Sequence, residues 1–334
     1  MRVIGAVLAV VAMVVAAGCG GQSEASATSK GDTTLTLVAY STPREVYAQL
    51  TRDFARTAAG RDVSFQESYA ASGEQSRAVA AGLPADVVAF SLEPDVTRLV
   101  DEGIVEPSWS QDEHGGMVSD SVVVFAVRKG NPKGIRSWAD LTRSGVEVIT
   151  PNPFTSGGAQ WNVMAAYGAQ LELGRSEQQS LGYLRRLFRN VSVQDKSARE
   201  ALQTFVGGKG DVLLAYENEA ILAQAKGEEL DYVVPEQTIL IENPIAVVGE
   251  GGNAETAQAF VDFARTPAAQ RVFGKAGYRP VLEDVLGEFD YPAPASLFTI
   301  TDLGGWKSVR ARFFDVEDGV MADIQRELGQ SLGE

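Results

Sequence analysis

The sequence predicts an α/β protein of two lobes, each built on a mixed, mainly parallel sheet flanked by helices. Its 334 residues are 45% hydrophobic and 22% charged, which is the composition of a folded globular protein, and they are too many for one small core. Apolar runs at 34–39 and 86–90 alternate with amphipathic stretches such as 44–58, and strands that alternate with helices form parallel sheets. Two longer β-type runs, 121–127 and 238–248, stand where the chain would cross between the lobes.

The first 33 residues are expected to direct export. A basic start, Met1-Arg2, precedes an apolar run over 3–17 that is too short for a spanning helix, so we expect a signal peptide over 1–18. Cys19 is the single cysteine of the chain, so no intramolecular disulfide can form. Its place after Ala-Gly resembles a bacterial lipobox, which implies that Cys19 is lipidated and anchors the exported chain to the outer face of the plasma membrane. Residues 19–33, small and polar, would form a tether with a reach of roughly 20 Å.

We expect the first lobe to comprise residues 34–120 and 245–334. Apolar residues at helical spacing, as at Val46, Leu50 and Phe54, predict its helices, and alternating or wholly apolar runs predict its strands. In order, the expected elements are a strand at 34–39, a helix at 44–58, a strand at 62–67, a helix at 74–81, a strand at 86–90 and a helix at 95–102. Later helices at 254–265 and 267–275, with a tail that contains Trp306, would complete this lobe.

We expect the second lobe to comprise residues 121–244, between the two crossings. Ser137 offers a hydroxyl cap for a short helix over 137–141. The same patterns predict a strand at 146–149, helices at 161–173 and 177–188, a strand at 190–194, a helix opened by 195–201, a strand at 210–216, a helix at 220–226 and a strand at 231–234.

Hydroxyl residues recur where a predicted strand ends and a predicted helix begins. Ser41, Ser72 and Ser156 each occupy such a junction, and Ser156 is followed by Gly157 and Gly158, which leave backbone N–H groups uncovered. Ligands collect at the carboxyl ends of parallel strands, and helix N-termini there attract anions. The formal charge of −15 argues against nucleic acid or an anionic membrane surface as a charge-driven partner. An anionic ligand would therefore be held by local dipoles and hydrogen bonds.

With these junctions in place, the chain resembles the sulfate/thiosulfate-binding proteins of ABC importers, which are periplasmic binding proteins of type II. Eight ordered blocks carry the resemblance: Tyr40–Glu45, Ser68–Gln75, Arg128–Pro132, Val148–Pro153, Ser156–Asn162, Gly210–Ala220, Tyr278–Pro280 and Leu297–Ile300. It implies two lobes joined by two crossings around a cleft that closes over one dianion. It also implies a monomer that binds sulfate or thiosulfate, delivers it to permease subunits, needs no cofactor and catalyses no reaction.

The resemblance further implies a set of ligand contacts. These are Ser41, Ser72, Ser156, Gly157, Gly158, Ala198 and Tyr216. Two positions depart from the family pattern. Ser41 stands where the family usually has an aspartate that supplies its backbone N–H, and it keeps that amide. Tyr216 stands where a tryptophan usually donates its indole N–H, and it offers a hydroxyl instead.

Proton count predicts the selectivity of such a site. Sulfate carries no proton at pH 7 and needs only donors, whereas phosphate usually carries one and needs an acceptor. A cavity of hydroxyls and amides with no inward carboxylate is therefore expected to reject phosphate. The nearest acids in the sequence, Asp195, Glu217 and Glu219, are expected to point outward or to cap helices.

Three alternatives remain open from the sequence. Molybdate or tungstate would suit the same architecture and donors. Iron(III) would require phenolate ligands, which Tyr40, Tyr69 and Tyr216 could supply, although the Ser-Gly-Gly junction offers donors rather than anionic oxygens. A serine hydrolase would need a base, for which the only candidates are the single histidine, His114, and Lys196 beside a serine.

Overall fold

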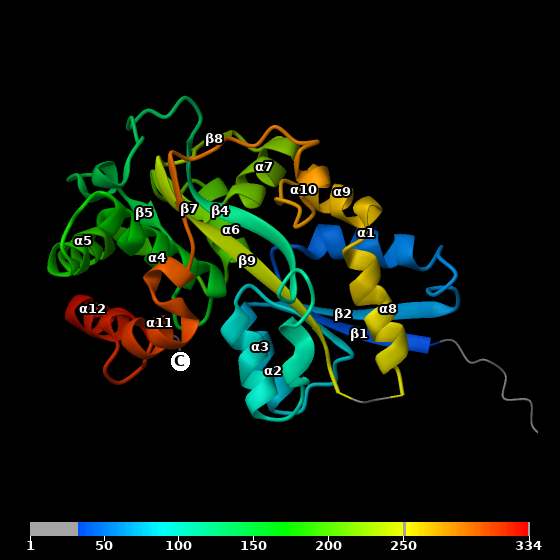
Figure 1. Ribbon diagram of the computed structural model, residues 1–334. Coiled ribbons are helices and arrows are strands. Elements are labelled where there is room, and N and C mark those ends of the chain that lie inside the picture. Colours follow the sequence, from blue (N-terminus) through cyan, green and yellow to red (C-terminus); the bar gives the residue numbers. More distant parts are fainter. Residues whose placement is uncertain (1–32, 250–251, 333–334) are drawn as a thin grey trace, which may run out of the picture. The chain divides into compact units, whose positions relative to one another are not determined.

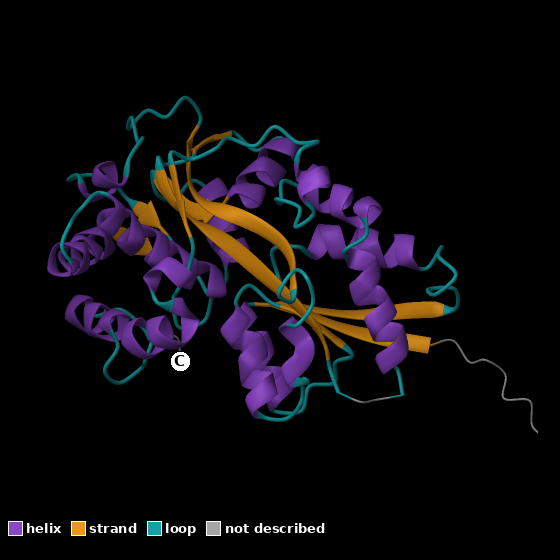
Figure 2. Ribbon diagram, viewed as in Figure 1, coloured by secondary structure: helices purple, strands orange, loops and turns teal. Residues whose placement is uncertain are grey.

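The computed structural model describes residues 33–249 and 252–332, so the predicted signal peptide, Cys19 and nearly all of the tether lie outside the described residues. The predicted α/β architecture is confirmed, with helices on both sides of the strands (Figure 2). The first lobe opens with three strands, each followed by a helix: β1 (Thr33–Tyr40), α1 (Arg44–Phe54), β2 (Val63–Ala70), α2 (Ser72–Ala80), β3 (Val87–Ala89) and α3 (Glu93–Asp101). β1 pairs in parallel with both β2 and β3, so the carboxyl ends of all three strands meet at one edge.

The two predicted crossings are the long strands β4 (Met117–Arg128) and β9 (Gln237–Val247), which run together in Figure 1. They pair with each other in antiparallel fashion. One end of β9 pairs with β3, and the far half of β4 pairs with β7 (Val212–Tyr216). The result is one continuous sheet in the order β2-β1-β3-β9-β4-β7-β5-β6, in place of the two separate sheets expected. The pair β4 and β9 thus joins the lobes both covalently and by hydrogen bonds.

The second lobe repeats the strand–helix pattern. Its elements are β5 (Val148–Ile149), α4 (Gly157–Glu172), α5 (Glu177–Arg189), β6 (Val191–Val193), α6 (Ala198–Val206), β7, α7 (Glu217–Ala225) and β8 (Leu230–Val233). β5 is parallel to both β6 and β7, so the helices that follow these strands begin at the same edge. α4 is buried along almost its whole length, because apolar or small residues occupy every face of it.

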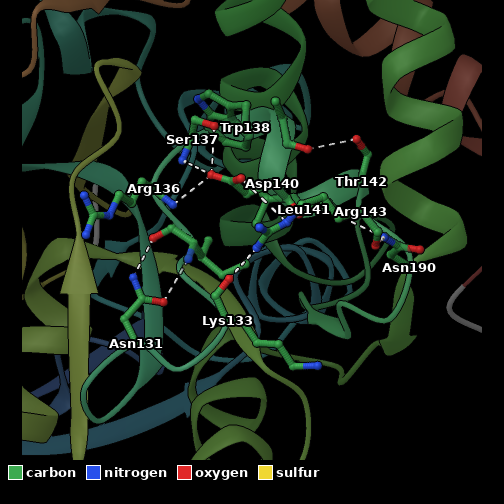
Figure 3. Close-up of polar contacts among 12 residues, drawn as sticks. Asn131, Lys133, Arg136, Ser137, Trp138, Asp140, Leu141, Thr142, Arg143 and Asn190 are labelled. Carbon is green, nitrogen blue, oxygen red and sulfur yellow. Dashed lines mark hydrogen bonds and ion pairs between the residues drawn. The ribbon is translucent and has the colours of Figure 1, made fainter.

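The predicted short helix with a hydroxyl cap is the 3-10 helix Trp138–Thr142 (Figure 3). The Asp140 carboxylate accepts hydrogen bonds from the Ser137 N–H at 2.9 Å and from its hydroxyl at 2.9 Å. Asn190, which ends α5 just before β6, donates to the carbonyls of Leu141 at 2.8 Å and Arg143 at 2.9 Å. This segment is therefore tied to the end of α5, and the Tyr183 hydroxyl of that helix also donates to its Trp138 carbonyl at 2.6 Å.

The C-terminal part of the chain packs against both lobes, whereas the prediction places all of it in the first. α8 (Ala254–Ala264) and α9 (Pro267–Lys275) pack with α1, as expected. The remaining elements are α10 (Glu283–Leu286), β10 (Ser296–Phe298), the 3-10 helix Thr301–Leu303, α11 (Gly305–Phe313) and α12 (Val320–Leu328). Phe298 and Trp306 of this tail share a core with Trp161 of α4. Gly168 makes this possible, because a Cβ there would lie 2.2 Å from the Phe298 ring.

Candidate functional site

The seven residues predicted as ligand contacts line one small cavity between the lobes. The complete lining is Tyr40, Ser41, Thr42, Ala70, Ala71, Ser72, Ser91, Ser156, Gly157, Gly158, Ser197, Ala198 and Tyr216. None of these residues is charged. The centre of a water molecule can occupy only about 10 Å³ of the cavity, so it suits one compact ion and no organic solute.

Three helices begin at this cavity: α2 at Ser72, α4 at Gly157 and α6 at Ala198. The first N–H groups of each helix have no intrahelical partner, and each helix end carries a partial positive charge. Ser156 caps α4 by accepting a hydrogen bond from the Ala159 N–H at 3.4 Å, which leaves its own hydroxyl proton available. The cavity therefore collects backbone and hydroxyl donors from both lobes without any cationic side chain.

The Ser72 hydroxyl has its proton committed elsewhere. It donates to the Asp95 carboxylate at 2.6 Å and accepts from the Ser91 N–H at 3.0 Å. Arg98 pairs with the other oxygen of Asp95 at 3.3 Å. A hydroxyl carries only one proton. Ser72 consequently offers its backbone N–H to the cavity, while its side chain holds the β3–α3 junction in place.

The two glycines at the start of α4 leave space for different neighbours. A Cβ on Gly157 would lie 2.6 Å from the Ser91 hydroxyl oxygen and 2.8 Å from Leu92, both in the first lobe. A Cβ on Gly158 would instead lie 3.3 Å from the Ala198 Cβ and 3.5 Å from Ser156 and Tyr216, which are cavity walls. Gly157 thus allows the lobes to approach each other, and Gly158 keeps the cavity open.

Comparison with known proteins identifies the architecture. Residues 35–279 match the family described as bacterial extracellular solute-binding protein. The chain belongs to this family. It is 41% identical to a sulfate-binding protein of Synechococcus elongatus over 92% of each chain, and 32% identical to a thiosulfate-binding protein of Pseudomonas aeruginosa over 86% of this chain and 90% of that one. The solved structure of the sulfate-binding protein SubI from Mycobacterium tuberculosis superposes with a TM-score of 0.82 at 46% identity, covering 85% of this chain and all of that one.

Six lining residues of this solute-binding protein were not among the predicted contacts: Tyr40, Thr42, Ala70, Ala71, Ser91 and Ser197. One of them is Ser91. It follows β3 as Ser41 and Ser72 follow β1 and β2, and this repetition was the signal that could have found it. Its hydroxyl lies 2.6 Å from the Tyr216 hydroxyl, and its carbonyl accepts from the Trp161 indole at 2.8 Å. Ser91 therefore contacts both the last residue of β7 and the first turns of α4 in the opposite lobe.

An ion pair outside the cavity also joins the two lobes. The Glu45 carboxylate of α1 accepts two hydrogen bonds from Arg199 of α6, at 2.8 and 2.9 Å, and a third from Lys226 at 2.5 Å. Burial alone would raise the pKa of Glu45, but these cations more than offset it and lower that pKa to about 2. Arg199 directly follows Ala198, which lines the cavity. Because Glu45 neutralises the charge of Arg199, this cation does not make the cavity positive.

The nearby acids were expected to point outward or to cap helices. Two of them do not point outward, and Glu219 accepts a hydrogen bond from the Tyr216 N–H at the N-cap of α7. Glu217 and Glu219 lie in the first turn of α7 and are almost fully buried, because that turn is covered by the first lobe and the β4–β9 pair. Glu217 pairs with Arg279 at 2.8 Å. Burial raises the pKa of Glu219 to about 7, against the lowering effect of Arg199. Asp195 is half-buried and accepts from the Thr204 hydroxyl at 3.0 Å, and none of the three acids lines the cavity.

Proposed function

We propose that this solute-binding protein captures sulfate, with thiosulfate as a second ligand, in the cavity between its lobes and delivers it to an ABC permease. The observation that carries the proposal is a small cavity where three helices begin and whose lining holds hydroxyls and amides but no charged side chain. Helix ends and uncharged donors suit an anion, and the small volume suits a tetrahedral inorganic one.

The donors present can supply the affinity that uptake of a scarce ion requires. Backbone N–H groups of Ser41, Ser72, Gly157, Gly158 and Ala198 border the cavity, and hydroxyls add to them. Hydrogen bonds to a charged partner contribute roughly 1.5–3 kcal/mol each, and helix ends add roughly 0.3–2 kcal/mol each. After the costs of immobilisation, six or seven such contacts are sufficient for micromolar binding, about −8 kcal/mol.

Selectivity is expected to follow from proton count. A ligand that carries a proton must donate it, and no carboxylate lines the cavity to accept it. Calorimetry of the purified exported protein with sulfate, thiosulfate, molybdate and phosphate tests this. We expect heat with sulfate at micromolar concentrations, a weaker response with thiosulfate and none with phosphate. Absence of heat with sulfate, or phosphate binding of similar strength, would reject the proposed ligand.

The alternatives receive less support from the site. Molybdate and tungstate share the charge and shape of sulfate but have longer bonds, which the small cavity disfavours. For iron(III), Tyr40 and Tyr216 line the cavity, but Tyr69 donates its hydroxyl to Glu67 at 3.0 Å and lies under Arg44. Within the described residues, no cluster of three or more histidine, cysteine or carboxylate side chains is arranged for a metal.

We propose that the protein catalyses no reaction. His114 is absent from the cavity lining, and the hydroxyl of Ser197, beside Lys196, caps α6 by accepting from the Glu200 N–H at 3.2 Å. A nucleophilic serine therefore lacks a base among the residues that border the cavity. Unchanged sulfate, recovered by ion chromatography after prolonged incubation with the protein, is the expected result.

We further propose that the exported monomer is anchored through a lipid on Cys19, which would hold it near the permease subunits. Over the described residues, no helix has the length and hydropathy needed to cross a bilayer. We propose that residues 34–120 and 245–334 form the first lobe and residues 121–244 the second. The tail from Ser296 belongs to the first lobe by this division and also packs against the second. Cys19→Ala should move the protein from the membrane fraction to the soluble fraction without a change in sulfate affinity.

A further inference from the structure

A hydroxyl pair spans the cleft at the cavity wall. Ser91, at the β3–α3 junction, belongs to the first lobe, and Tyr216, the last residue of β7, belongs to the second. Their oxygens are 2.6 Å apart, a short hydrogen bond, and each residue is only 1% exposed. The two residues are 125 positions apart in the chain, so only contact between the lobes brings them together.

The surroundings of Ser91 fix its position closely. Its N–H donates to the Ser72 hydroxyl at 3.0 Å. Its carbonyl accepts from the Trp161 indole at 2.8 Å and from the Asn243 amide at 3.3 Å. The absent side chain of Gly157 leaves room for its hydroxyl against α4. Every polar atom of Ser91 is thus engaged, and its hydroxyl has Tyr216 as its partner.

Proton count then decides what the pair can do. Two hydroxyls carry two protons, and one of these lies in the bond between them. The phenol is the stronger donor, and an anion is a stronger acceptor than a serine oxygen. In the favourable arrangement the Ser91 hydroxyl donates to the phenol oxygen of Tyr216, and the Tyr216 hydroxyl donates to the ligand. Each of these two hydrogen bonds polarises the next.

We propose that Ser91 is a positioning residue for the ligand: it orients the Tyr216 hydroxyl, so that the cavity gains this donor only when the two lobes meet. The inference rests on the proposed function and deepens it, because it assigns the Tyr216 contact to a pair rather than to a single side chain. It also links that contact to lobe closure, since either lobe alone holds only half of the pair.

A double-mutant cycle tests the proposal. Removing a hydrogen bond to a charged ligand lowers the binding affinity roughly 10- to 150-fold, and removing one between neutral groups lowers it roughly 2- to 12-fold. We expect Tyr216→Phe to weaken sulfate binding by about 10-fold or more and Ser91→Ala by about 3- to 10-fold. In the Tyr216→Phe background, Ser91→Ala should have no further effect, because the donor it orients is already gone.

Kinetics provide a second readout that a merely structural role would not change. The pair forms after the ligand has entered, so Ser91→Ala should raise the sulfate dissociation rate and leave the association rate unchanged. Ser180→Ala is the matched control, since Ser180 is also fully buried but bonds to the Ser176 carbonyl in α5, away from the cavity. It should alter neither rate.

The outcomes separate this inference from the proposed function. If the wild-type protein fails to bind sulfate, the proposed function falls. If the wild-type protein binds sulfate, two results would reject only the positioning role. Ser91→Ala would leave sulfate affinity unchanged, or it would lower that affinity by the same factor in the wild-type and Tyr216→Phe proteins. If Ser91→Ala is too unstable to purify, Ser91→Cys can replace it, because a thiol has a shape similar to that of the hydroxyl but is a weaker donor. Ser91→Cys must then show the same dependence on Tyr216 in the double-mutant cycle.

Discussion

The substitution Gly158→Ala should abolish binding while leaving the fold intact. The added methyl group would lie 3.3 Å from the Ala198 Cβ and 3.5 Å from both Ser156 and Tyr216, so it would occupy space between residues that line the cavity. The cavity offers only about 10 Å³ to the centre of a water molecule, which leaves no second place for the ligand. A sulfate oxygen excluded from that position loses at least two hydrogen bonds of roughly 1.5–3 kcal/mol each. The expected loss is about 3 kcal/mol or more, which is over 100-fold in affinity.

The same change should not destabilise the protein. Gly158 lies in the first turn of α4, and alanine is favoured over glycine in helices by roughly 1 kcal/mol, which offsets the tight 3.3 Å contact. The assay is calorimetry with sulfate, together with the melting temperature measured without ligand. Gly182→Ala is the control, because a Cβ there meets only the Arg186 side chain at 3.6 Å on α5. Sulfate binding within fivefold of wild type by a folded Gly158→Ala variant would refute the location of the site.

Three further predictions concern charges outside the cavity. Glu45→Gln breaks the ion pair with Arg199 across the lobes, so sulfate should dissociate about threefold faster, and stopped-flow traces should lose the salt dependence of the wild type. Burial raises the pKa of Glu219 to about 7, and its charged form repels an anion. Sulfate affinity should therefore fall a few-fold between pH 6 and pH 8. In Glu219→Gln the sulfate affinity should not change over this pH range. Burial and the facing Glu242 carboxylate raise the pKa of Asp120 to about 8, so stability is lost as pH rises from about 4 to about 8. Asp120→Asn should raise the melting temperature by about 2 °C at pH 8 and leave it unchanged at pH 4, whereas an equal shift at both values would contradict the linkage.

Periodicity was sufficient to predict most strands and helices as far as residue 275, but it placed the starts of two site helices too late. The helix expected from 161 begins at Gly157, and the one expected from 74 begins at Ser72. Glycine and serine are poor interior helix formers, so an apolar pattern does not extend to them. At a helix start their conformation is decided by capping and by the neighbouring lobe, as with the Ser156 cap of α4. The turns that line the cavity are therefore the parts that local pattern predicts least well.

Contacts between segments that are far apart in the chain could not be predicted from the sequence, for a different reason. An apolar run at 297–300 shows that a side chain such as Phe298 is to be buried, but not that Gly168 of α4 leaves the space for its ring. Likewise, the contact between Ser91 and Tyr216 depends on the strand order, which places β3 and β7 on opposite sides of the β4–β9 pair. Register between strands and packing between lobes are set by the whole fold, and single segments carry little information about either.

The organisation of charge around the cavity gives the site its discrimination. A cation in contact with the ligand would strengthen binding of every anion alike, because Coulomb attraction does not distinguish one oxyanion from another. Here the nearest arginine, Arg199, is held by the Glu45 carboxylate at 2.8 Å, and the cavity lining is neutral. What remains at the ligand is a set of directed donors, which distinguishes an oxygen that only accepts from one that carries a proton. Because the chain as a whole has a formal charge of −15, the field outside the cleft opposes anion entry. Capture must therefore depend on short-range hydrogen bonds that form only when the lobes meet. Because these hydrogen bonds are lost when the lobes separate, the ligand can then leave.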